Sequence, residues 1–437
     1  MGNSSRFPIP DSRFPIPDSR FPIPDSRFPI PFFDQSYVDI SNNIMSEFTG
    51  EEWVKIRETL ADDPTKYGLP KREYGSVVLG SFNIRKLGRV TNRSPETWDF
   101  LAHVCKHFDL LAIQEIMDDL SGFQELKGRM GSEFGTIVSD RTGVFPNEPG
   151  LGERLGFIYN LSMVQRGEVV SDISFDRTKV LETLARNYDQ INQAILPYVD
   201  YLKELDQWNS NQLGKRPNNP NVRMPVFLTF ARQPFCVSFR IVGHPGTNPY
   251  EFMAVNAHLY FGNYISDRRQ EFDALMAWIL GRFIEHDRAY YPNFILLGDL
   301  NLDFDNPTTD RYRIEKQIKM FNAEVRGEAN VNFPFLDPHP ATNQVLRTNA
   351  RFTETFDQIG LFNWDQRLPT YKEHSSMGEN PRGPDYGVFN FVELFSDALY
   401  NRGVSELSLS EKKTFFRRFE HEVSDHLPLW LRLPLPD

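Results

Sequence analysis

The sequence has little cysteine, no long apolar run and no excess of positive charge. Only two of its 437 residues are cysteines, Cys105 and Cys236, which is too few for a disulfide framework. No uninterrupted apolar stretch approaches the length of a membrane span, and the first residues lack the apolar segment of a secretory signal. These absences predict a cytoplasmic protein in a reducing setting, with no membrane partner.

The charge balance limits how the chain can bind other molecules. It carries 48 Lys and Arg against 59 Asp and Glu, a formal net charge of −11. A protein that coats nucleic acid is normally basic, because neutralisation of phosphates dominates its affinity. The acidic balance therefore argues against a broad, non-specific nucleic-acid surface. It leaves open an enzyme whose bound metal ions supply positive charge at the site itself.

Residues 1–34 form a proline-rich tail built from a repeated heptapeptide. The letters SRFPIPD occur three times, over Ser5–Asp11, Ser12–Asp18 and Ser19–Asp25, and their first six recur over Ser26–Pro31. Two prolines in every repeat exclude a continuous helix and favour an extended, polyproline-like chain. A tolerated, expanded tail is the interpretation we favour, and an arm that binds a protein partner is the alternative. Nothing indicates an oligomeric state.

The remainder divides into an N-terminal extension over residues 35–74, with a helix at Glu51–Leu60, and one large domain over residues 75–437. Short β-branched and apolar runs predict strands in the large domain: Ser76–Ile84, Leu110–Gln114, Thr136–Asp140, Leu155–Tyr159, Val226–Phe230, Pro234–Val242, Phe252–His258, Phe294–Gly298 and Leu429–Leu433.

Helices are expected from Ser94, with Ser as N-cap and Pro at the first turn, to about Phe108, and over Asp267–Arg282. Apolar residues at helical spacing between Lys179 and Trp208 predict a helical insertion at about 179–222, closed by a loop over Asn209–Val222. Several strands follow one another with few helices between them. This order predicts an α/β fold: a two-layer β-sandwich of mixed sheets flanked by helices.

Polar side chains that can carry chemistry recur where the predicted strands end. They lie in seven short stretches: Phe82–Arg85, Gln114-Glu115, Glu153-Arg154, Asn256–His258, Gly298–Asn301, Phe356–Ile359 and Ser424–His426. Each stretch has a simpler interpretation when taken alone. Asp299 and Asn301 could form a capped turn, Glu115 could be a solvated edge charge, and each histidine could be a hydrogen-bonded core residue.

The stretches taken together favour a hydrolytic site. Two histidines, several carboxylates and two asparagines at strand ends are what metal-assisted hydrolysis of a phosphodiester requires. A water must lose a proton, the leaving oxygen must gain one or be stabilised, and the charge on the phosphorane must be neutralised.

The order of these motifs and their amino-acid sequences resemble those of the endonuclease/exonuclease/phosphatase superfamily, whose familiar member is deoxyribonuclease I. The resemblance runs from about Gly75 to Leu433. It rests on SFNIRKLG, AIQE, ERLGFIY, an R-x-P triplet at Arg223–Pro225, GDLN, FDQI and SDHLP. It implies the fold of deoxyribonuclease I and a metal-dependent phosphodiesterase activity.

The resemblance also implies roles for single residues. Those implied as ligands of the catalytic Mg²⁺, or of Mn²⁺ in its place, are Asn83, Glu115 and Asp425. Arg85 and Arg223 are implied as phosphate contacts. His258, oriented by Glu153, would be a general acid or a phosphate ligand, and His426 the matching base or phosphate contact. Asp357 would support one histidine. The pair that would position the attacked phosphate and the water is Asp299 and Asn301.

Three hypotheses follow for the function. The first is an intracellular nuclease, such as an endonuclease, acting on DNA or RNA. The second keeps the fold and the metal and changes the substrate to a phosphoinositide or a small phosphoester. The third is a non-catalytic binding module, which the full set of chemically able residues disfavours. The N-x-H motif that ends at His258 is more similar to the corresponding sequence of deoxyribonuclease I, deadenylases and phosphatases than to that of abasic-site endonucleases.

Overall fold

The structure is a computed structural model that describes residues 48–142, 152–220, 222–261, 264–304, 309–340, 342–368 and 385–436. The heptapeptide-repeat tail and residues 35–47 of the predicted extension lie outside the described residues. Among the described helices, none has both the length and the apolar character that crossing a membrane requires.

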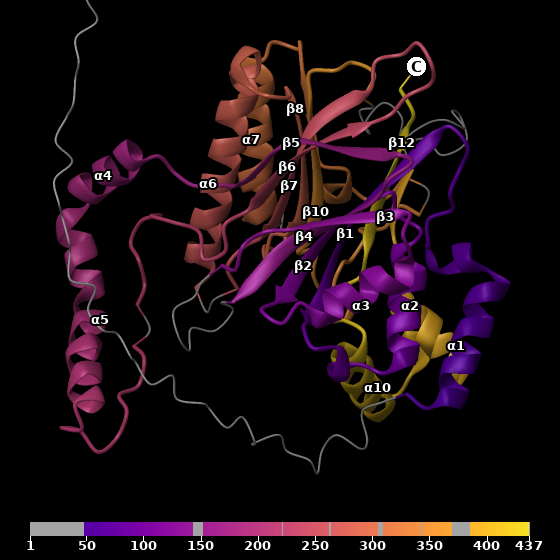
Figure 1. Ribbon diagram of the computed structural model, residues 1–437, viewed down its shortest axis with the longest axis horizontal. Coiled ribbons are helices and arrows are strands. Elements are labelled where there is room, and N and C mark those ends of the chain that lie inside the picture. The colour runs from indigo at the N-terminus through magenta and orange to yellow at the C-terminus, as the bar shows by residue number, and fades with distance from the viewer. Residues whose placement is uncertain are drawn as a thin grey trace, which may run out of the picture. The chain divides into compact units, whose positions relative to one another are not determined.

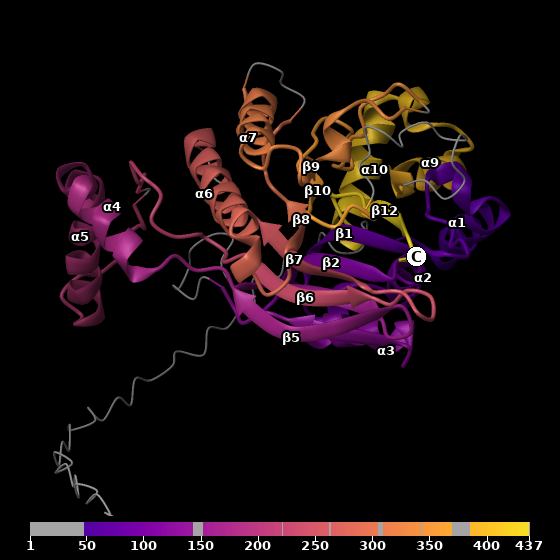
Figure 2. The same ribbon diagram turned by 90° about the horizontal axis from the view of Figure 1, so that it is seen from above.

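Two six-stranded sheets pack face to face (Figures 1 and 2). The first sheet has the order β11 (Asp385–Val388), β12 (Leu429–Pro434), β1 (Ser76–Leu87), β2 (Leu110–Met117), β4 (Glu153–Asn160) and β3 (Phe134–Val138). The second has the order β5 (Val164–Asp172), β6 (Phe235–Ile241), β7 (Tyr250–His258), β8 (Asn293–Asp299), β10 (Asp357–Asn363) and β9 (Asn330–Asn332). The pairs β1–β2 and β7–β8 are parallel and the other neighbours antiparallel, so both sheets are mixed. The predicted sandwich is confirmed.

Alternate side chains along β1 face the space between the two sheets. On β1, Val77 and Leu79 belong to the apolar cluster between the sheets, whereas Val78 and Phe82 belong to the cluster under the helices. This is the two-residue period of a strand that is buried on both faces. The same parity continues toward the end of β1 with Asn83, so the inner face changes from apolar to polar along the strand.

Helices cover the outer face of each sheet (Figure 2). α6 (Ile265–Ile284) and α7 (Asp310–Glu324) share an apolar cluster with the second sheet. The helices that share a cluster with the first sheet are α1 (Gly50–Asp62), α2 (Pro95–Cys105), α3 (Ser121–Met130), α9 (Phe391–Tyr400) and α10 (Leu409–Glu422). Capping residues mark the N-termini of two of these helices. Ser94 caps α2 ahead of Pro95, and Ser408 and Glu411 form a capping box at α10.

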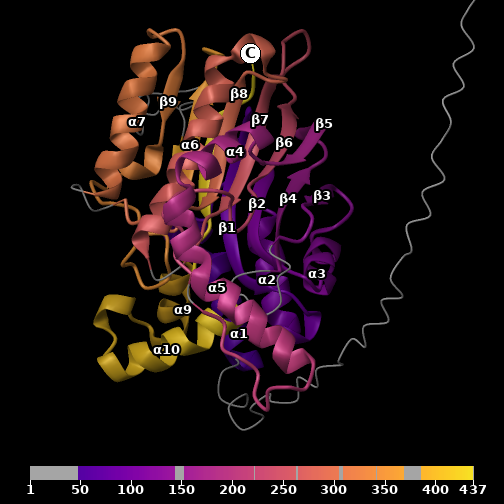
Figure 3. The ribbon, with the colours of Figure 1, turned by 90° about the vertical axis from the view of Figure 1, so that its left-hand side faces the viewer.

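The predicted helical insertion is an arm of two helices, α4 (Arg177–Arg186) and α5 (Tyr188–Asn209), which break at Asn187. The arm stands away from the sandwich in Figures 1 and 2, and in Figure 3 it lies in front of the sheets. No residue of α4 is buried. The predicted loop after α5 contains no helix or strand in its described residues.

One strand prediction is wrong, and several elements were not anticipated. Val226–Phe230 forms no strand. Its rings pack instead in a small aromatic cluster, where the centroids of Phe227 and Phe230 lie 5.0 and 5.8 Å from that of Phe175. Elements that the sequence pattern did not single out include β5, β9, β11, α3, α7, α9 and α10.

Candidate active site

The polar ends of neighbouring strands meet at one edge of the sandwich. Asn83 on β1, His258 on β7, Asp299 on β8 and Asp357 on β10 are all buried. His258 pairs in register with Asp299, and Asp299 in turn with Asp357. Since β7 and β8 run parallel, their carboxyl ends lie at the same edge and bring these side chains together.

Asp299 lies at the centre of the group. Its Oδ2 accepts a hydrogen bond from Asn83 Nδ2 at 3.1 Å. The same oxygen lies 3.7 Å from His258 Nε2 and 3.6 Å from His426 Nε2. Asn301 holds the other oxygen, since its backbone N–H donates to Asp299 Oδ1 at 2.9 Å. Two imidazoles and an amide therefore face one buried carboxylate.

Each histidine is held from behind by a second carboxylate. Glu153 Oε2 lies 3.0 Å from His258 Nδ1, and Asp357 Oδ2 lies 2.8 Å from His426 Nδ1. The contact of His426 with Asp357 is a hydrogen bond, and that of His258 with Glu153 is a close ion-pair contact. A carboxylate at Nδ1 orients the ring and leaves Nε2 directed at the site. The partner of His426 is Asp357 and not the adjacent Asp425, because adjacent residues of an extended chain point to opposite sides.

The charges of this group are interdependent. Burial lowers the pKa of His426, but the carboxylates of Asp357 and Asp299 outweigh it and hold that pKa well above its ordinary value. Burial raises the pKa of Asp299, yet the two imidazoles bring it below its usual range. Burial dominates at Asp357, whose pKa is raised. Asp299 therefore stays ionised beside a His426 that tends to remain protonated.

Irregular backbone at the strand ends sets these positions. Glu115, on β2, has φ +57° and Lys86, on β1, has φ +46°, where the pairing of β1 with β2 shifts register. The backbone N–H of Lys86 donates to Glu115 Oε2 at 2.9 Å, which holds the carboxylate in place. On β8, Gly298 has φ +148°, and a Cβ there would lie 1.9 Å from the carbonyl oxygen of Ala257. Only glycine permits this approach of β7 and β8.

The donors for a cation are oxygen atoms. Among the described residues, Asn83 Oδ1 and Asp425 Oδ1 are buried without a hydrogen-bond partner. Glu115 Oε1 lies 3.2 Å from Asn83 Nδ2. Amide and carboxylate oxygens are what Mg²⁺ prefers, and a buried acceptor without a partner is costly unless a cation or a donor meets it, so this set fits Mg²⁺. A second group could also hold an ion: Asp299, Asp357 and His426 offer ligand atoms within 4.8 Å of one another.

These residues surround a cavity of about 360 Å³. Its lining includes Glu115, His258, Asp299, Asn301, Asp425 and His426, all of which the sequence motifs singled out. Phe356, the first residue of the FDQI motif, lines it too, and so do residues that the motifs did not include: Arg232, Phe261, Asn349, Arg351 and Glu420. Most of the latter come from loops, whose course a single sequence does not reveal.

Of the two arginines implied as phosphate contacts, the structure brings only one near the group. Arg85 Nη1 lies 3.2 Å from Asp425 Oδ2. Arg223 is half-exposed, does not line the cavity and donates to Ser266 Oγ at 2.9 Å. Buried Arg232 lies in the cavity wall instead, with Nε 2.8 Å from Glu153 Oε2. Arg232-Gln233-Pro234 is also an R-x-P triplet and directly precedes β6. The sequence therefore contained a second triplet of the kind by which Arg223 was selected.

A buried arginine ties two parts of the site together. The Arg93 guanidinium donates to four backbone carbonyls, those of Arg85, Lys86, Glu422 and Val423. The first two follow Asn83 on β1, and the last two precede the Ser-Asp-His motif. Ser424 adds a direct link, since its Oγ donates to the carbonyl of Asn83 at 2.7 Å. The metal-ligand candidates on the two segments are thus fixed relative to each other.

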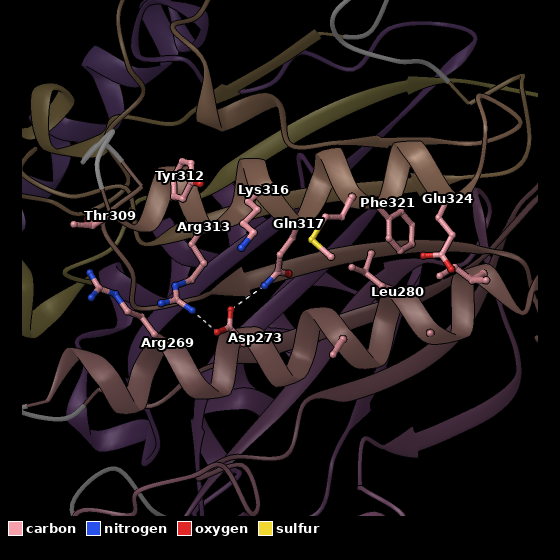
Figure 4. Close-up of a pocket in the computed structure, with 14 residues that line it drawn as sticks. Arg269, Asp273, Leu280, Thr309, Tyr312, Arg313, Lys316, Gln317, Phe321 and Glu324 are labelled. Carbon is pink, nitrogen blue, oxygen red and sulfur yellow. Dashed lines mark hydrogen bonds and ion pairs between the residues drawn. The ribbon is translucent and has the colours of Figure 1, made fainter.

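A larger groove of about 800 Å³ runs between α6 and α7 (Figure 4). Its walls carry apolar side chains such as Leu280, Met320 and Phe321. Asp273 lies within it, paired with Arg313 and accepting from Gln317 Nε2 at 2.8 Å (Figure 4). Volume alone would single out this groove, but its carboxylate Asp273 is already bound by Arg313 and Gln317.

Comparison with known proteins gives one distant curated relative. No protein-family model matches the sequence. A protein named deoxyribonuclease from Thioalkalivibrio sp. (strain K90mix) is 25% identical over 241 residues. The match covers 54% of this chain and 48% of the deoxyribonuclease, so the chain spans about half the length of that relative.

Solved structures align over most of the chain at low identity. An endonuclease/exonuclease/phosphatase family protein from Bacteroides thetaiotaomicron is 12% identical, covering 82% of this chain and 94% of its own, with a TM-score of 0.39. The human Nocturnin catalytic domain is 10% identical, covering 83% and 95%, with a TM-score of 0.40. The structure itself shows two six-stranded mixed sheets that pack face to face, with these polar side chains at the strand ends.

Proposed function

We propose that this protein is a Mg²⁺-dependent phosphodiesterase that cleaves nucleic acid. One observation carries the proposal. The Nε2 atoms of His258 and His426 lie 3.7 and 3.6 Å from the same carboxylate oxygen of Asp299, while carboxylates hold both Nδ1 atoms. Two oriented imidazoles around an ionised carboxylate supply the proton donor, the proton acceptor and the positive charge that hydrolysis needs.

Asn83, Glu115 and Asp425 would hold the Mg²⁺, with Mn²⁺ as a substitute. This set is chosen over the group of Asp299, Asp357 and His426 because all its ligand atoms can be oxygens, which Mg²⁺ prefers, whereas the other group includes an imidazole. When bound, Mg²⁺ supplies positive charge against the phosphate oxygens. Arg93 and Ser424 would act only through position, by holding the two segments that carry these ligands.

Asp299 would accept a proton from the attacking water, because its lowered pKa keeps it ionised. As the water oxygen bonds to phosphorus, the bond to the leaving oxygen breaks, and His258 Nε2 would donate a proton to that oxygen. Protonated His426 would hold a phosphate oxygen throughout. Glu153 and Asp357 would keep the two rings in place. The products are a phosphomonoester and an alcohol.

Nucleic acid is the proposed substrate because the curated relative is named deoxyribonuclease. Cations in the cavity wall also fit a polyanion: Arg232 and Arg351 both line it, although Arg232 pairs with Glu153 and Arg351 with Glu420. A small phosphoester would meet the same catalytic groups, so nucleic acid and small phosphoesters must be compared directly as substrates.

The test incubates the purified full chain with supercoiled plasmid and with labelled single-stranded RNA, in Mg²⁺ and in Mn²⁺. The variants are His258→Ala/Asp299→Ala and, as a control, Met320→Ala in the α6–α7 groove. We expect metal-dependent cleavage by the wild type and by Met320→Ala, and none by the double variant. Release of inorganic phosphate from small phosphoesters without polymer cleavage would support phosphoesterase activity and contradict nuclease activity. Cleavage by the double variant would contradict the site.

A further inference from the structure

Phe261 is an exposed aromatic side chain in the wall of the catalytic cavity. It is 63% exposed and lines the same cavity as His258 and Asp299. A single exposed apolar side chain is ordinary on a protein surface, so its exposure alone assigns nothing. Two further observations distinguish this ring: the backbone that carries it is fixed to the catalytic group, and a cation lies against it.

The backbone before Phe261 is held at successive positions. Leu259 N–H donates to the carbonyl of Asp299 at 3.0 Å, and the carbonyl of Leu259 accepts from Asn301 Nδ2 at 2.7 Å. Tyr260 N–H donates to the carboxylate of buried Glu271 at 2.7 Å. The chain that leads into Phe261 is therefore fixed to the residues that flank the proposed scissile phosphate.

A guanidinium lies against the ring. The Arg268 guanidinium carbon is 4.7 Å from the Phe261 ring centroid, and Arg268 Nη1 donates to the carbonyl of Asn301 at 3.3 Å. A cation at this distance is attracted by the electrons of the ring face. Phe261 in the cavity wall thus combines an exposed aromatic surface with the positive charge of Arg268 beside it.

A ligand that matches this surface must be anionic and must carry a flat π-system beside its phosphate. A nucleotide has both, whereas a sugar phosphate or an inositol phosphate offers hydroxyl groups and a lipid offers alkyl chains. A base can stack on a side chain only when its face is free, which a base inside a duplex does not allow.

We propose that Phe261, with Arg268 against its ring, forms a stacking site for an unpaired base next to the scissile phosphate. The protein would then act on single-stranded nucleic acid or on unpaired nucleotides within a duplex. This inference rests on the proposed function, since it places a base beside the phosphate that the catalytic group cleaves.

The test compares Phe261→Ala and Phe261→Trp with the wild type. The control is Tyr312→Ala, which removes a ring of similar exposure, 60%, from the α6–α7 groove. The substrates are a labelled single-stranded oligonucleotide, its duplex, and the same strand with the bases replaced by hydrogen. Affinity for each strand is also measured in EDTA by fluorescence anisotropy, which needs no cleavage.

We expect Phe261→Ala to lower kcat/KM and affinity for the single strand by about tenfold, the loss expected for one base–aromatic stack, while Phe261→Trp retains both. The base-free strand should not distinguish wild type from variant, and the duplex should be cleaved more slowly. Cleavage that Phe261→Ala leaves unchanged would overturn the stacking site. Equal losses on the base-free strand would also overturn it, since they indicate a structural role. If the wild type binds through Phe261 but cuts no polymer, the proposed function fails and the stacking site stands.

Discussion

The catalytic cavity and the α6–α7 groove differ in a way that volume does not capture. The groove, at about 800 Å³, is more than twice the size of the cavity, at about 360 Å³. In the groove, Asp273 is bound by Arg313 and Gln317, and apolar side chains form much of the wall (Figure 4). At the cavity, the Nε2 atoms of two imidazoles and the amide of Asn83 all face Oδ2 of the buried Asp299 carboxylate. Several chemically able groups around one buried carboxylate indicate chemistry better than volume does.

The difference arises from the elements that build each region. Two helices line the groove, and their polar side chains can bend to reach one another along the surface. Strand ends and loops line the cavity, and the sheets fix the residues at the strand ends. Polar groups placed there cannot all find partners within the protein, and the remainder are available to a substrate or an ion.

The largest effect is expected at the centre of the cavity. Asp299→Asn removes the carboxylate that both imidazoles face, so cleavage should fall by about 10³-fold or more. The matched change in the groove is Asp273→Asn, which should leave the rate nearly unchanged. Initial rates on a labelled oligonucleotide, with circular dichroism to confirm folding, measure both. Similar losses in the two variants would remove the distinction between the regions.

A large effect on stability is expected at Arg93. Arg93→Met leaves the carbonyls of Arg85, Lys86, Glu422 and Val423 without their donor. The free energy of unfolding should fall by about 3 kcal/mol, since buried groups lose their partners. Urea denaturation measures it. The exposed Arg57→Met on α1 is the control and should change stability by no more than about 0.5 kcal/mol.

A smaller effect on activity is expected at Glu153. Glu153→Gln keeps the shape of the side chain and removes the charge beside His258 Nδ1, so the ring is less well oriented. The value of kcat should fall by about 10- to 100-fold with little change in KM. Steady-state kinetics across pH would show the change, with exposed Glu58→Gln as control. An unchanged kcat with a raised KM would mean that Glu153 serves substrate binding instead.

The smallest effect is expected in the groove itself. Met320→Ala and Tyr312→Ala remove side chains that are 64% and 60% exposed, and neither contacts the catalytic group. Cleavage rates should stay within about twofold of the wild type, since surface substitutions rarely perturb distant sites. A loss comparable to that of Glu153→Gln would show that the groove takes part in the reaction.

Strand periodicity made much of the fold predictable. The expected strands at Ser76–Ile84, Leu110–Gln114 and Phe252–His258 correspond to β1, β2 and β7, because runs buried on both faces leave a strong apolar signal. The error at Val226–Phe230 has the same origin, since an aromatic cluster also produces an apolar run. Helix α10 was missed because its exposed face makes most of its sequence polar.

The gathering of Asn83, His258 and Asp299 at one edge also follows from strand parity and direction. The contact between His426 and Asp357 does not, because it joins residues 69 positions apart through a fold that only the structure reveals. Between Arg223 and Arg232, both followed by x-Pro, the sequence offered no criterion, because each triplet leads into a predicted strand and only the structure shows that Val226–Phe230 is not one. Loops carry Phe261 and Arg351 to the cavity, and no local pattern predicts where a loop ends in space.

Reversible removal of the metal tests the central claim most directly. Purified protein is treated with EDTA, assayed on a single-stranded oligonucleotide, and assayed again after Mg²⁺ is restored. The wild type should lose cleavage and regain it, whereas Glu115→Gln should recover little even at high Mg²⁺. Cleavage that persists in EDTA, or that Glu115→Gln recovers as fully as the wild type does, would contradict a metal-dependent phosphodiesterase site at these strand ends.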